Sequence, residues 1–172
     1  RYPRSQGTGV AIKNEPMRMP WGKGQLLRTG QDLGLIAIGS MVDPAIVAAE
    51  ALASKGISAS VVNARFVKPL DKELILDVAS SCGRIITIEE GVLSGGFGSA
   101  VLELLAEEGL QRVKVSRMGI PDSFVEHGSR FELLNDLGLT SDGIISFSKQ
   151  ICDEPTSITR SDEFLNIGRV TH

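Results

Sequence analysis

The amino terminus carries the residues whose types and spacing point most directly to chemistry. Arg1-Tyr2-Pro3-Arg4 places two guanidinium groups around a stiff Tyr-Pro pair, because proline fixes its own φ and biases the preceding residue toward an extended backbone. A guanidinium group matches a phosphate or carboxylate through two parallel hydrogen bonds. The segment is therefore a candidate anion clamp, and the ordinary alternative is a chain end whose arginines are only solvated.

A pair of adjacent acids, Glu89 and Glu90, follows a run of strand-forming residues. Open α/β sheets place their sites beyond the carboxyl ends of parallel strands. Neighbouring residues of an extended strand point to opposite faces, however, so the two carboxylates are poorly placed to act as a catalytic dyad. We expect them to contact a partner or to accept hydrogen bonds from nearby backbone N–H groups.

A second polar loop, after a later strand, contains Asp122 and His127. A carboxylate and an imidazole in one loop can orient each other and line the rim of a site. The alternative is that Asp122 starts a turn after Pro121 and His127 is an exposed loop residue. Arg65 and Lys68 also follow a strand, and for them a contact between domains is favoured over catalysis.

The glycine-rich run Gly95-Gly96-Phe97-Gly98 lies between a strand and a helix, where phosphate-binding loops occur. It departs from the dinucleotide pattern because Val101 occupies the last glycine position, and no lysine of a P-loop follows it. The adjacent acids would also repel a phosphate. The pattern favours a tight turn that packs a helix closely on a strand.

Composition narrows the possible classes of protein. The chain has 172 residues, 42% of them hydrophobic, which is typical of one globular domain. A net charge of -3 argues against a general nucleic-acid surface, and no apolar run approaches the length of a membrane span. Cys82 and Cys152 have no metal-ligand spacing and are interpreted as reduced thiols of a cytoplasmic protein. We expect no metal, no cofactor and no catalytic residue to belong to this chain alone.

Apolar runs of strand length alternate with amphipathic segments of helix length. Strands are expected over 24–28, 33–38, 57–62, 84–88 and 113–118, and helices over 44–55, 71–80, 98–108, 129–138 and 140–152. Asp43 is expected to cap the first helix, and Ser129 with Glu132 forms the pattern of a capping box. This order predicts a three-layer α/β/α fold with a mainly parallel five-stranded sheet. Residues 1–32 form an irregular lead-in, 33–152 the α/β domain and 153–172 a polar, loosely ordered tail.

Several of these segments occur together in one known family. The segments are Arg1-Tyr2-Pro3-Arg4, Trp21 to Gly24, Asn63 to Asp71, Ile88 to Gly91 with Gly95 to Gly98, and Gly119 to Gly128. From residue 1 to about 152 the chain resembles the C-terminal domain of the 1-deoxy-D-xylulose 5-phosphate synthases, which belong to the transketolase superfamily. The Lys-Pro-Leu-Asp and Glu-Glu-Gly segments are shared across that superfamily.

The resemblance implies a larger homodimeric enzyme that condenses pyruvate with D-glyceraldehyde 3-phosphate, releases carbon dioxide and begins isoprenoid synthesis. Thiamine diphosphate and Mg²⁺ would be held by preceding domains, which are the expected partners of this chain. Arg4 matches the family arginine that binds the phosphate of the small aldehyde, and Arg1 and Tyr2 would lie beside it. The family usually has glycine where this chain has Ser5. Such an enzyme is cytoplasmic, or plastidial in a plant or alga.

Two other functions stay open from the sequence. The first is the corresponding domain of a 2-oxoacid dehydrogenase beta subunit, in which Arg4 would meet nothing phosphorylated, or of a transketolase. The second is a non-catalytic interaction module, which a native start methionine a few residues upstream of Arg1 would favour. On every one of these alternatives the chain alone is expected to be inactive.

Overall fold

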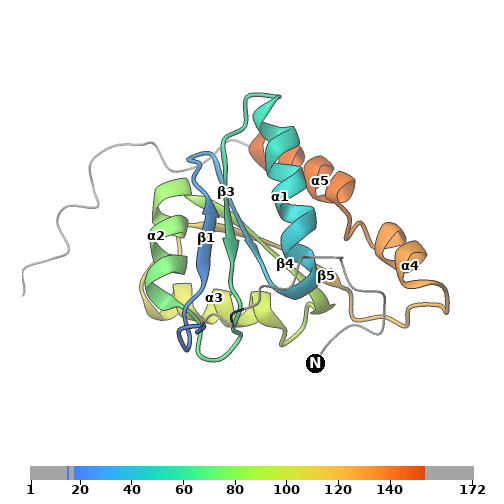
Figure 1. The fold of residues 1–172 in the computed structure, drawn as a ribbon, viewed down its shortest axis with the longest axis horizontal. Coiled ribbons are helices and arrows are strands. Elements are labelled where there is room, and N and C mark those ends of the chain that lie inside the picture. Colours follow the sequence, from blue (N-terminus) through green and yellow to red (C-terminus); the bar gives the residue numbers. More distant parts are fainter. Residues whose placement is uncertain (1–14, 16–17, 154–172) are drawn as a thin grey trace, which may run out of the picture.

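The computed structural model describes residue 15 and residues 18–153 of the chain. Figure 1 shows a central sheet with helices on both sides. The strands are β1 (Gln25–Arg28), β2 (Leu33–Ala37), β3 (Ala59–Asn63), β4 (Arg84–Val92) and β5 (Lys114–Ile120). The helices are α1 (Val42–Ala53), α2 (Lys72–Cys82), α3 (Phe97–Glu107), α4 (Arg130–Asp136) and α5 (Ser141–Asp153). The predicted three-layer α/β fold is confirmed.

The sheet has the strand order β1-β3-β2-β4-β5. Strands β2, β3, β4 and β5 pair in parallel, and β1 runs antiparallel to β3 at one edge. Every residue of β2 is buried, because this strand lies at the centre of the sheet and is covered on both faces. Alternate residues of one strand therefore enter two different cores.

The two cores lie on opposite faces of the sheet. On one face Leu35 and Ile88 pack against α1 and α5, which lie side by side in Figure 1. On the other face Ile36 and Ile85 pack against α2 and α3. Because β2 is followed by α1 on the first face and β4 is followed by α3 on the second, the chain diverges between these neighbouring strands. Such a divergence is where open α/β sheets bind ligands.

The start of α1 differs from the sequence prediction. Asp43 is not the N-cap, because a 3₁₀ turn over Gly39–Met41 precedes the helix and Met41 occupies the cap position. Asp43 and Pro44 lie in the first turn, where proline is tolerated because the missing N–H has no helical partner. Val47 also faces outward, with 52% of its surface exposed, whereas the smaller Ala45 and Ala48 pack on the sheet.

The anion clamp and the tail cannot be placed in this fold. Arg1, Tyr2 and Arg4 lie outside the described residues, as does the segment 154–172. Within the described part of the chain, no helix combines the length and the apolar composition needed to cross a bilayer.

Truncating a side chain that is buried between the sheet and one helix layer should be costly. Ile36 is fully buried between β2 and the α2–α3 layer, so Ile36→Ala should lower the free energy of unfolding by about 2–5 kcal/mol. Val47→Ala, on the exposed side of α1, is the control and should change it by about 0.5 kcal/mol or less. Urea denaturation of both variants measures the difference, and equal losses would contradict the assignment of the core.

Candidate functional site

The carboxylate of Glu89 closes the glycine-rich turn from inside the protein. Glu89 is 6% exposed and accepts hydrogen bonds from the backbone N–H groups of Phe97 (2.9 Å) and Gly98 (2.8 Å) at the start of α3. A β-carbon on Gly96 would lie 2.1 Å from the carbonyl oxygen of Val92 and 2.5 Å from Glu89 Oε2. Glycine is required here because backbone and carboxylate leave no room for a side chain.

The N-terminus of α3 is therefore already satisfied by an internal anion. A phosphate would have to displace Glu89 from the N–H groups that it accepts from, and would meet its negative charge. The diphosphate of thiamine diphosphate does not fit this turn. Among the described residues no cluster of acidic, histidine or cysteine side chains suits a metal ion either. The expected close packing of the turn, and the expected contact of Glu89 with backbone donors, are confirmed.

Glu90 points to the opposite face of β4 and joins three separate segments. The guanidinium of Arg130 donates from Nε to Oε1 (2.8 Å) and from Nη2 to Oε2 (2.5 Å). The hydroxyl of Ser40 donates to Oε2 as well (2.5 Å). The hydrogen bonds from Arg130 hold the pKa of Glu90 below its usual range, although partial burial opposes them, and the hydrogen bond from Ser40 lowers the pKa by a smaller amount.

The Glu90 cluster, defined as Ser40, Glu90 and Arg130, lies at the divergence between β2 and β4. Ser40 follows β2, Glu90 belongs to β4, and Arg130 is the first residue of α4. A bidentate arginine fixes both the distance and the orientation of the segments that it joins. The cluster therefore fixes one end of the loop 121–128 next to the carboxyl edge of the sheet.

Asp122 and His127 both lie in that loop and both are exposed. Among the described residues, no hydrogen bond joins the side chains of Asp122 and His127. The structure thus places both on the predicted edge of the sheet without bringing them together. Their role at the rim of a site stays a prediction.

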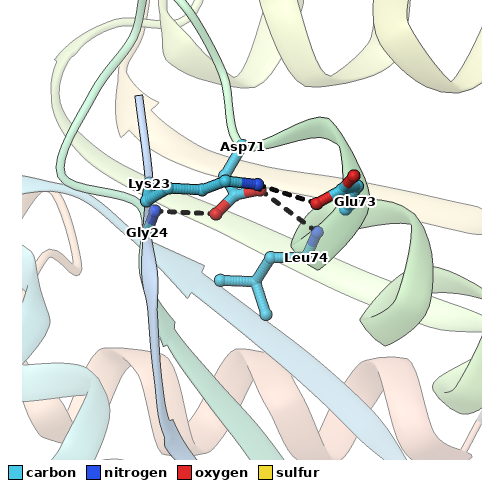
Figure 2. Close-up of polar contacts among 5 residues, drawn as sticks. All are labelled: Lys23, Gly24, Asp71, Glu73 and Leu74. Atoms are coloured by element: carbon cyan, nitrogen blue, oxygen red, sulfur yellow. Dashed lines mark hydrogen bonds and ion pairs between the residues drawn. The ribbon is translucent and has the colours of Figure 1, made fainter. Parts of the chain in front are cut away.

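A second polar cluster holds the segment that precedes β1. Figure 2 shows the carboxylate of Asp71 between the two parts of the chain that it connects. It accepts hydrogen bonds from the N–H of Gly24 (2.9 Å) and from Lys23 Nζ (3.2 Å), and it caps α2 through the N–H of Leu74 (3.4 Å). Asp71 is 7% exposed, so these donors replace the water that the carboxylate loses.

Packing contacts reinforce this connection. Gly22 has a φ of +67°, and a β-carbon there would lie 2.7 Å from Pro69 Cγ. The rings of Trp21 and Phe66 lie 5.7 Å apart at 54°. Arg65 adopts a left-handed backbone with a φ of 58° and donates from Nη2 to Gln25 Oε1 (2.5 Å). The segments from Trp21 to Gly24 and from Asn63 to Asp71 thus form one unit.

Comparison with known proteins identifies the class of this domain. The family model described as "Transketolase, C-terminal domain" matches residues 22–144, so the chain belongs to the transketolase C-terminal domain family. A solved split-gene transketolase, described as an inactive beta4 tetramer, is similar with a TM-score of 0.72 and 36% identity. That similarity covers 78% of this chain and 43% of the other.

Other relatives are more similar in sequence than this transketolase, and they have one name in common. 1-Deoxy-D-xylulose-5-phosphate synthase 1 of Geobacter metallireducens is 56% identical over 144 residues, which are 84% of this chain and 23% of the relative. The synthase of Heliobacterium modesticaldum is 52% identical over 157 residues, covering 91% of this chain and 24% of the relative. The chain spans about a quarter of the length of these relatives and matches their C-terminal domain.

The Glu90–Arg130 pair should make stability depend on pH. Because the pKa of Glu90 is lowered by folding, the pair stabilises the fold above the unfolded pKa of about 4.3, and this is lost as pH falls through the folded pKa. Glu90→Gln should therefore cost about 1 kcal/mol at pH 7 and less in acid.

Urea denaturation at several pH values between 7 and 3 measures whether the difference in unfolding free energy between the wild type and Glu90→Gln becomes smaller in acid. Glu103→Gln, which removes an exposed carboxylate from α3, is the matched control and should stay within about 0.5 kcal/mol of the wild type throughout. A Glu90→Gln deficit that does not shrink in acid would contradict the charged pairing.

Asp71 should matter far more than its acidic neighbour. Asp71→Asn loses the charge opposite Lys23 and one acceptor for the N–H groups of Gly24 and Leu74, which should cost about 1–3 kcal/mol of unfolding free energy. Glu73→Gln removes only the exposed second partner of Lys23 and should cost about 0.5 kcal/mol or less. Thermal or urea denaturation of both variants measures the two losses of unfolding free energy. Similar losses would show that Asp71 does not hold the segment before β1 to α2.

Proposed function

We propose that this chain is the C-terminal domain of a 1-deoxy-D-xylulose-5-phosphate synthase and supports the acceptor side of that enzyme's active site. The whole enzyme condenses pyruvate with D-glyceraldehyde 3-phosphate and releases carbon dioxide. The observation that carries the proposal is the 56% identity with a named synthase over 144 residues. The 36% identity with a transketolase structure makes a transketolase the second candidate.

In this proposal the chain supplies binding and positioning rather than the reacting groups. Thiamine diphosphate, with Mg²⁺, provides the decarboxylation chemistry and is held by domains outside this chain. The occupation of the α3 N-terminus by Glu89 supports that division, because the glycine-rich turn before this helix already binds its own anion.

Arg4 is proposed to bind the phosphate of the aldehyde, with Arg1 and Tyr2 beside it. Support comes from the chemistry of the guanidinium group and from the direction of the chain. Gln25 at the start of β1 pairs with Asn63 at the end of β3, so residues 18–24, which lead into β1, lie at the carboxyl edge of the parallel strands. That edge also carries the Glu90 cluster and the loop of Asp122 and His127.

The assembly and location of the enzyme are part of the same proposal. The enzyme acts as a homodimer in the cytoplasm, or in the plastid if its source is a plant or alga. The self-assembly of the split transketolase into a beta4 tetramer supports an oligomeric arrangement, since its domain resembles this chain.

Substitution of Arg4 tests the acceptor role. A charge-assisted contact of about 1.5–3 kcal/mol is lost in Arg4→Ala, so use of glyceraldehyde 3-phosphate by the full-length enzyme should fall by about one to two orders of magnitude. Arg4→Lys should recover only part of this, because a point charge cannot replace a planar fork. Pyruvate affinity should barely change.

Steady-state kinetics with each substrate varied in turn provides the measurement. Arg112→Ala, which removes an exposed guanidinium from the turn before β5, is the control and should retain wild-type kcat/KM for the aldehyde. An Arg4→Ala enzyme with unchanged kcat and KM for glyceraldehyde 3-phosphate would contradict the role of Arg4.

The isolated chain should not bind the cofactor. Glu89 occupies the N–H groups at the start of α3, so calorimetric titration with thiamine diphosphate and Mg²⁺ should give no measurable heat of binding at micromolar concentrations. Micromolar binding by the chain alone would overturn the division of labour proposed here.

A further inference from the structure

An exposed apolar surface lies where the chain approaches β1. It consists of Met19 (57% exposed), Trp21 (77%) and Val67 (48%), and is called the Trp21 patch. In Figure 1 the turn before β1 and the segment after β3 lie together at the lower edge of the sheet. The patch therefore combines two segments that are distant in sequence.

Trp21 is held in place by its neighbours. Trp21 contacts the ring of Phe66, Gly22 packs directly on Pro69, and the carboxylate of Asp71 holds Lys23 and Gly24. A tryptophan that is fixed by its neighbours yet left mostly exposed loses little side-chain entropy when a partner covers it. Tryptophan and methionine are enriched at the centre of protein interfaces.

Two observations point to the partner that covers the patch. The chain spans about a quarter of its relatives and matches their C-terminal domain, so most of each relative precedes the matched region. The chain also runs directly from the patch into β1. In an enzyme arranged like these relatives, a preceding domain would be joined covalently on the amino-terminal side of Trp21, which would give that domain a high effective concentration at the patch.

The surroundings of the patch define the chemistry of that partner. Arg18 and Lys68, both exposed, border the apolar side chains, whereas Lys23 is already paired with Asp71 and Glu73. An apolar centre with a cationic rim fits a surface that presents apolar side chains surrounded by carboxylates.

We propose that the Trp21 patch is the docking surface for the domain that precedes this chain in the full-length enzyme. The inference rests on the proposed function, because it requires that such a domain exists. Docking fixes the carboxyl edge of the sheet, and with it the residues just before β1, against the rest of the enzyme.

Hydroxyl-radical footprinting with mass spectrometry tests the proposal in the full-length enzyme and in this chain alone. The oxidation rates of Trp21 and Met19 should be those of exposed side chains in the isolated chain and should fall roughly fivefold or more in the full-length enzyme. Val47, on the outer side of α1 and 52% exposed, reports unrelated surface and should react equally in both.

Variants show whether the patch couples the domains. In the full-length enzyme Trp21→Ser should separate a single thermal transition into two and should raise KM for the aldehyde. Phe131→Ser is the matched control, because Phe131 is an aromatic with 78% exposure that follows β5 at the opposite edge of the sheet. It should leave the single transition intact. Both isolated chains should melt within about 2 °C of the wild type, since the replaced rings are mostly exposed.

Three results would overturn the proposal. Equal oxidation of Trp21 in the two proteins would show that no domain covers it. Slow oxidation in the isolated chain, with sedimentation as a dimer, would assign the patch to a second copy. If Phe131→Ser separates the thermal transition of the full-length enzyme as strongly as Trp21→Ser does, the Trp21 patch is not the docking surface. A protected Trp21 in an enzyme that does not condense pyruvate with glyceraldehyde 3-phosphate would refute the proposed synthase and leave the docking surface standing.

Discussion

The arrangement of the carboxyl edge depends on one carboxylate, that of Asp71. It is almost fully buried, and its donors come from α2 and from the segment before β1. A buried carboxylate without those donors would be costly, so the two segments stay together only as a unit. The antiparallel strand β1, the exposed Trp21 and the path of residues 18–24 all depend on this connection.

The neighbouring acids Glu89 and Glu90 show how one strand serves two layers. Because alternate residues of β4 face opposite sides, Glu89 closes the turn before α3 while Glu90 joins Ser40 and Arg130 across the divergence of β2 and β4. Both carboxylates are used to position backbone and loops. The chain is therefore equipped to shape one side of a site, which agrees with a C-terminal domain whose reacting groups lie elsewhere.

The fold was predictable from the sequence because its signals are local. The buried run at β2, the capping box of Ser129 and Glu132, and the opposite orientation of Glu89 and Glu90 are all present as expected. The start of α1 was predicted wrongly, since a 3₁₀ turn that no local pattern signals takes the cap position. Apart from Leu74, which Asp71 caps, the partners of Asp71 and Glu90 lie 40 or more residues away, at Lys23, Gly24, Ser40 and Arg130. No spacing rule could find them, although the position of both acids at strand or helix ends indicated where to look.

Transfer of the domain tests the central claim most directly. A chimera would carry this chain in place of the matching C-terminal domain of the Geobacter metallireducens synthase, with which it shares 56% identity. With pyruvate and D-glyceraldehyde 3-phosphate it should form 1-deoxy-D-xylulose 5-phosphate at a kcat/KM within about tenfold of the parent, or about 1.4 kcal/mol in barrier height. A chimera that folds, assembles and binds thiamine diphosphate like the parent, yet forms no product, would contradict the assignment of this chain to such a synthase.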